Sequence, residues 1–145
     1  PGRKGLSENI TVRSIVGDFL EHTRNFYFHN DGTPKVYGGS ADVMVRSFDR
    51  RIESMFAFVN PRVKQQAIHI LDYNLRDNVN SYELLVDRNY IKCAIPEEGE
   101  PFNIHERFFE VTLEEVMKTQ LFVQPQPEEA TAQAVPVAET PVTEL

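Results

Sequence analysis

Cysteine is nearly absent from this chain of 145 residues, because Cys93 is the only one. A single cysteine cannot form an internal disulfide, which predicts a protein of a reducing compartment. Cys93 lies in the apolar run 90–95 and is typical of a small buried hydrophobic residue. Long apolar runs are absent as well, since no stretch approaches the ~20 residues that span a bilayer. The sequence therefore predicts no membrane-spanning segment.

Common nucleotide and metal signatures are also missing. The chain has neither a G-x-x-x-x-G-K-[ST] loop nor a G-x-G-x-x-G turn, which argues against a phosphate-loop kinase and a Rossmann dehydrogenase. His29, His69 and His105 have no Cys, Asp or Glu at the spacings of metal ligands, so the sequence predicts no metal site in this chain. The chain begins with Pro1 rather than Met, and we interpret it as a fragment of a longer protein.

Charge is unevenly distributed along the sequence. The formal net charge is -7, yet residues 1–51 hold eight Lys and Arg against six Asp and Glu. This local excess favours a small anionic ligand over a nucleic acid, which needs a wide basic face. Residues 125–145 hold four Glu, four of the nine Pro, no basic residue and no aromatic residue. That composition predicts a disordered tail after a domain of residues 1–124.

The apolar spacing predicts an alternation of strands and helices. Residues 12–22 have helical spacing, and residues 24–29 alternate like a strand, with a turn at 30–32 and a return strand from Lys35. The remaining predictions are a strand over 51–59, a helix from Asn60-Pro61, a hairpin of 82–86 with 90–95, and a helix from Asn103 to about Lys118. The fold class expected is α+β or α/β, with a mixed sheet flanked by helices.

One short segment combines residues suited to phosphate chemistry. His22 and Arg24 are two residues apart, so on an extended strand their side chains lie on one face. An imidazole near neutral pKa can act as acid or base, and a guanidinium is a bidentate partner of phosphate. We expect Gly39 and Ser40 to bring backbone amides and a hydroxyl to the same anion.

Arginines and carboxylates complete the candidate site. Arg46 and Arg50 are four apart and share a face if the segment is helical, whereas Asp42 and Asp49 are expected to orient the histidine or the arginines. A simpler explanation exists for each residue: a histidine at a helix C-terminus suits the dipole, and clustered arginines form a solvated face.

Several motifs together resemble the last domain of bacterial polyphosphate kinase of the histidine-phosphorylated class. They are L-S-E-N-I at 6–10, F-L-E-H-x-R at 19–24, K-V-Y at 35–37, G-S-A-D-x-M-x-R at 39–46 and D-x-R-I-E at 49–53. The resemblance continues to Asn103 and implies a phospholipase D-like half domain. The phospholipase pattern is H-x-K followed by Gly-Ser-x-Asn. The corresponding residues here are His22-x-Arg24 and Gly39-Ser40-Ala41-Asp42. An arginine in place of the lysine keeps the positive charge and adds a guanidinium that can bind phosphate through two N–H groups. Val43 and Ser47 stand where the family often has Trp and Asn.

The resemblance implies reversible transfer of the terminal phosphate of ATP to polyphosphate through a phosphohistidine. It implies that His22 contacts the nucleotide phosphates as a candidate acid or base, that Mg²⁺ is bound mainly by upstream domains, and that the isolated fragment is inactive. The expected partners are ATP or ADP, polyphosphate, the upstream domains of the same polypeptide and further copies in a homo-oligomer, with no specific nucleic acid. The expected location is the cytoplasm, either free or peripheral to the inner membrane. Two alternatives remain: a phospholipase D-like phosphodiesterase half-domain, and a non-catalytic polyanion-binding or oligomerisation module.

Overall fold

The computed structural model describes residues 1–121, and the tail expected over 125–145 lies outside these residues. The described chain folds into two antiparallel sheets of three strands each, with helices beside them. The α+β class is thereby confirmed, although the expected single mixed sheet is divided into two small antiparallel ones. No helix within residues 1–121 has the length and apolarity required to cross a membrane.

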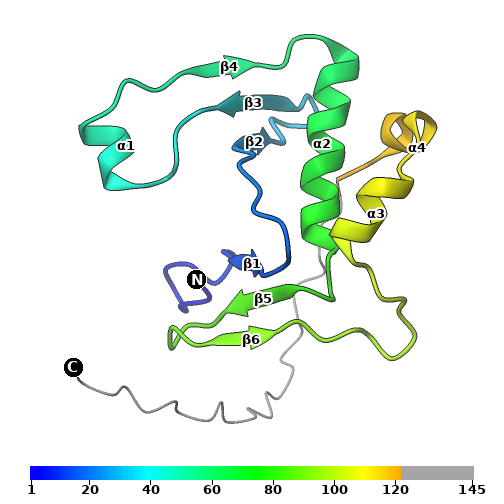
Figure 1. Cartoon of the computed structure of the whole chain (residues 1–145). Helices are drawn as coiled ribbons and strands as arrows, with labels where there is room; N and C mark the ends of the chain where they lie inside the picture. The colour runs from blue at the N-terminus through cyan, green and yellow to red at the C-terminus, as the bar shows by residue number, and fades with distance from the viewer. Residues whose placement is uncertain (122–145) are drawn as a thin grey trace.

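The first sheet has the order β2-β3-β4 and contains the predicted hairpin. β2 (Asn25–Phe28) pairs with β3 (Lys35–Gly39), and β3 pairs with β4 (Met55–Ala57). Asn30 and Asp31, with φ of 48° and 51°, make the turn between the first two strands, a conformation that Asn and Asp tolerate better than other side-chain-bearing residues. The short helix α1 (Val45–Asp49) connects β3 to β4 and lies at one end of the molecule (Figure 1).

The second sheet has the order β1-β5-β6 and contains an unexpected strand. β5 (Ser81–Leu84) and β6 (Tyr90–Lys92) form the predicted hairpin, and β1 (Arg13–Ile15) pairs with β5. The helix predicted over residues 12–22 is therefore wrong. The guanidinium of Arg13 donates to the carbonyls of Leu75 and Asp77 at the end of α2, so long-range pairing outweighs the local helical spacing.

α2 (Pro61–Arg76) runs between the two sheets, and α3 (Ile104–Glu110) and α4 (Leu113–Lys118) lie along one side of it (Figure 1). Asn60 caps α2 as predicted, because its side chain accepts hydrogen bonds from the amides of Arg62 and Val63. The single helix expected after Asn103 is divided in two, since Thr112 caps α4.

The hydrophobic core consists of two small clusters along α2. One contains Val36, Ala67 and Ile68, and the other contains Tyr73, Phe102 and Ile104. Along α2 the residues with the apolar spacing of one helical face are Val63, Ala67, Ile70, Leu71 and Leu75. Of these residues Ala67 alone is fully buried, because α3 and α4 pack against the neighbouring face instead.

Candidate functional site

The centre of the candidate site is an ion pair between Arg24 and Asp42. Arg24 immediately precedes β2, and Asp42 lies in the loop that leads from β3 to α1. The Nε of Arg24 donates to Oδ1 of Asp42 at 2.8 Å, and Nη2 donates to the same oxygen. Nη1 donates to the backbone carbonyl of His22. The guanidinium is therefore fixed on two sides and retains two N–H groups for a further acceptor.

Asp42 also lies near two other positive groups. Its Oδ2 is 3.7 Å from Nη2 of Arg46, the side chain of which is 54% exposed. The hydrogen bond from Arg24 holds the pKa of Asp42 below its usual value, with smaller contributions from the charges of Arg24, Arg46 and His22. Two arginines thus share one carboxylate, and the cluster keeps a net positive charge for an anion. Asp42 therefore contacts both Arg24 and Arg46, and its orienting role stays a prediction.

His22 is exposed to solvent beside this cluster. Its backbone carbonyl accepts a hydrogen bond from Nη1 of Arg24, so the residue adjoins the Arg24–Asp42 pair. The imidazole is not enclosed in apolar side chains, so it remains available to a ligand or a proton. The structure therefore brings His22, Arg24, Asp42 and Arg46 together.

Ser40 and Gly39 make other contacts than those expected. The amide of Gly39 donates to the carbonyl of Arg24 at 3.1 Å, and the amide of Ser40 donates to the carbonyl of Ser54 at 3.0 Å. The expectation of free amides at this bend is wrong, because both complete the sheet. The hydroxyl of Ser40 donates to Glu53 and accepts from the amide of Ser54. Glu53, which the sequence did not predict as a partner of Ser40, fixes this hydroxyl.

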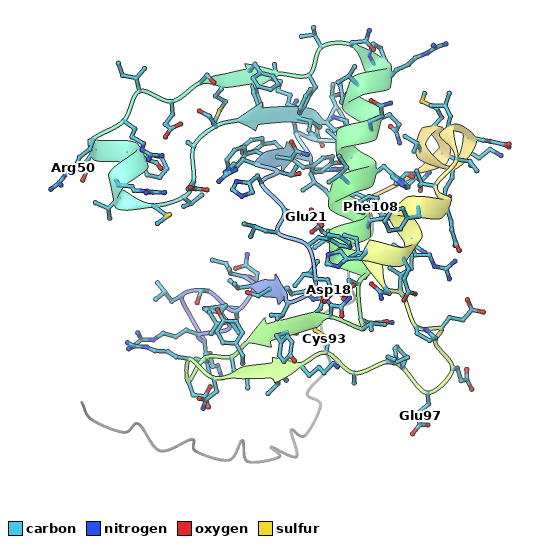
Figure 2. All side chains as sticks on the ribbon, viewed as in Figure 1. Asp18, Glu21, Arg50, Cys93, Glu97 and Phe108 are labelled. Atoms are coloured by element: carbon cyan, nitrogen blue, oxygen red, sulfur yellow. The ribbon has the colours of Figure 1, made fainter. Side chains whose placement is uncertain are left out.

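Arg50 and Asp49 do not join the cluster. Both residues are exposed at the end of α1, and Figure 2 shows Arg50 at the outer tip of the helix, directed away from the sheets. Arg46 and Arg50 lie four residues apart, yet of the two it is Arg46 that lies within ion-pair distance of Asp42. The four-residue spacing therefore indicated a shared helix but not a shared site.

A cavity beside the end of α2, lined also by residues of α3 and α4, is a separate feature. It measures about 530 Å³ and is lined by Tyr73, Arg76, Phe102, Arg107 and Glu115, among others. Arg76 stacks over the ring of Phe102 at 4.2 Å and pairs with Asp72. No residue predicted for the phosphate site lines this cavity, so the cavity is not part of that site.

Comparison with known proteins decides the family of the chain. A family model described as polyphosphate kinase C-terminal domain 2 matches residues 1–105. The chain belongs to this family. All four clustered residues, His22, Arg24, Asp42 and Arg46, lie inside the matched range.

Individual polyphosphate kinases agree with this assignment. The chain is 50% identical over 101 residues to the polyphosphate kinase of Neisseria meningitidis serogroup B, covering 69% of this chain and 15% of that protein. It is 45% identical over 100 residues to the polyphosphate kinase of Parasynechococcus marenigrum, covering 69% and 14%. The crystal structure of polyphosphate kinase from Porphyromonas gingivalis matches with a TM-score of 0.67 and 33% identity, covering 72% of this chain and 16% of that chain. The chain thus spans a small part of the relatives' length.

Proposed function

We propose that this chain is the C-terminal catalytic-type domain of a polyphosphate kinase, which moves the terminal phosphate of ATP reversibly to inorganic polyphosphate. The observation that supports this most directly is the cluster of Arg24, Asp42 and Arg46 beside the exposed His22. The relatives named above are all called polyphosphate kinase, which favours this reaction over phosphodiester hydrolysis.

The reaction proceeds in two displacements through a histidine of a domain outside this chain. A nitrogen of that histidine attacks the terminal phosphorus of ATP, a P–N bond forms, and the P–O bond to ADP breaks. A terminal oxygen of polyphosphate then attacks the same phosphorus, and the P–N bond breaks. Each displacement spreads negative charge over the peripheral oxygens of the moving phosphoryl group.

The residues of this chain stabilise that charge and move a proton. The two remaining N–H groups of Arg24 donate to a peripheral oxygen while Asp42 holds the guanidinium in place. Arg46 adds a second positive charge from α1. His22 binds a phosphate oxygen and exchanges a proton with it. Ser40, fixed by Glu53, and Gly39 shape the bend beneath the ligand.

Arg50 and Asp49 have a more distant role in this proposal. From the exposed end of α1, Arg50 meets the polyphosphate chain away from the reacting phosphorus, and Asp49 orients this end of the helix. A long polyanion has phosphates at regular spacing, so an outer arginine contributes to its affinity without touching the reacting group.

Magnesium is not assigned to residues of this chain. Within residues 1–121 no group of three His, Cys, Asp or Glu side chains is arranged to hold a metal ion. We propose that upstream domains of the same polypeptide hold Mg²⁺ and that the active protein is a homo-oligomer working in the cytoplasm. Every step assigned to this chain depends on its own arginines and histidine.

The experiment that tests the proposal uses a chimera. Residues 1–105 replace the corresponding region of the Neisseria meningitidis polyphosphate kinase, to which the chain is 50% identical over 101 residues. We expect the chimera to make polyphosphate from ATP and the 145-residue chain alone to make none, because the nucleophilic histidine is absent from it. Synthesis by the chain alone, or its hydrolysis of bis(p-nitrophenyl) phosphate, contradicts the proposal.

A further inference from the structure

His105 projects from a rigid base at the start of α3. Asn103 caps this helix by accepting from the amide of His105 at 3.1 Å and from the side chain of Asn80 at 2.9 Å. The amide of Ile104, which lies between Asn103 and His105, donates to Asp77 at 3.0 Å, and Ile104 is fully buried. These bonds fix the backbone at His105 and at the two residues before it, so the imidazole projects from a well-anchored start of α3.

The segment that leads to His22 rests on this ring. A Cβ added to Gly17 would lie 2.2 Å from Cε1 of His105, so the glycine backbone is in direct contact with the imidazole. The ring of Phe19 meets the imidazole edge-on, with the centroids 5.3 Å apart. The carboxylate of Glu21 lies 3.9 Å from Nε2 of His105. Three alternate residues of the segment therefore contact one side chain, which is 11% exposed.

These contacts determine which side of the segment faces α3. Glu21 and Thr23 line a cavity of about 370 Å³ together with His105 and Phe108, and Figure 2 shows Glu21 between the sheets on the side of α2. His22, between them in sequence, is exposed, and its carbonyl accepts from Arg24. The backbone at His22 is thus held by contacts with α3 before it and by the Arg24–Asp42 pair after it.

We propose that His105 is a positioning residue for His22. Its ring anchors residues 17–21 on α3 and so presents His22 to the phosphate beside Arg24. The catalytic part of this inference rests on the proposed function, whereas the positioning itself is a structural property of the chain. No part of it requires His105 to contact the substrate.

The positioning is tested directly in the 145-residue chain by NMR of the histidine rings. Gly17→Ala places a methyl group against the imidazole, so either the ring or the segment must move. His105→Ala removes the ring. We expect each variant to shift the ring signals of His22 and to leave those of His29 in place. The double variant should shift His22 no further than His105→Ala alone, because the methyl group then meets empty space.

Two NMR outcomes overturn the positioning. One is an unchanged His22 signal in both single variants. The other is a double variant whose shift is the sum of the two single shifts, since Gly17 then acts on His22 by a route other than the ring.

The catalytic consequence is tested in the chimera. We expect His105→Ala to lower kcat about 100-fold with little change in the KM for ATP, because the loss is one of geometry and not of ligand contact. His105→Phe, which keeps a ring against Gly17 and Phe19, should restore most of the rate. Full activity of His105→Ala contradicts the inference, and so does a failure of His105→Phe to improve on it. A fully active His22→Ala chimera instead overturns the proposed function, whereas the NMR result stands independently of it.

Discussion

Tyr73→Phe is expected to weaken the packing of α4 on α2 in a manner that depends on pH. Tyr73 is 2% exposed, its ring lies 5.0 Å from that of Phe102, and its hydroxyl donates to Glu115 on α4. Phenylalanine keeps the ring contacts and removes the hydrogen bond. Because Glu115 is exposed and regains water, we expect the free energy of unfolding to fall by about 1.5 kcal/mol at pH 8, the lower range for a bond to a charged group.

The same hydroxyl makes the parent protein sensitive to alkali. Burial, with a further contribution from the Glu115 carboxylate, raises the pKa of Tyr73 from 10.0 to about 12. Between these values the unfolded chain has lost the proton that the folded chain keeps, so stability decreases as pH rises. At pH 11 this difference costs the parent about 1.4 kcal/mol, from 1.36 kcal/mol per pKa unit. Tyr73→Phe has no such proton to lose.

Urea unfolding at pH 8 and pH 11 checks this reasoning. The difference in free energy of unfolding between the parent and Tyr73→Phe should shrink from about 1.5 kcal/mol at pH 8 to nearly zero at pH 11, since the parent alone loses the tyrosine contribution. Tyr90→Phe is the matched control, because Tyr90 is 48% exposed. The free energy of unfolding of this variant should differ little from that of the parent at either pH. A gap for Tyr73→Phe that stays constant between pH 8 and pH 11 refutes the assigned role of the hydroxyl.

Two further predictions concern buried and clustered charges. Burial lowers the pKa of His69, the Nδ1 of which lies 2.7 Å from Oγ1 of Thr119. The unfolded histidine binds a proton near pH 6.5 and the folded one resists it, so the free energy of unfolding should decrease below that pH. Thermal unfolding of the His69→Gln variant should therefore depend less on acid than that of the parent. Asp42→Asn in the chimera should lower kcat/KM about 10- to 100-fold by releasing the Arg24 guanidinium. Asp49 is exposed on α1, so Asp49→Asn should lower kcat/KM much less. Equal losses of kcat/KM in the two variants contradict the orienting role of Asp42.

Local signals in the sequence identified most elements of the fold. The hairpin of β2 and β3 has its turn at Asn30-Asp31-Gly32, and α2 begins at the Asn60 cap. One error was the helix predicted over residues 12–22, which have helical apolar spacing. Residues 13–15 instead form β1, and their partners in β5 are 66 to 70 positions away. Gly17 inside that segment indicates the reason, since its lack of a side chain is needed against His105.

The site was predictable where neighbouring charges decide the geometry. The sequence suggested that Asp42 orients an arginine, and Arg24 has that carboxylate as its partner. The contacts of Ser40 with Glu53 and of Glu21 with His105 were not predictable. Each joins residues that meet only after β3 has paired with β4 or α3 has packed against α2, so no local pattern in the sequence records them.

The role of His22 is the central claim, and the initial rate of polyphosphate synthesis by the chimera tests it most directly. His22→Ala should lower this rate at least about 100-fold, the range expected for loss of a general acid or base. His29→Ala should keep the parent's rate, because His29 is exposed at the end of the β2–β3 hairpin, away from the Arg24–Asp42 pair. Equal rates for the two variants would contradict the account.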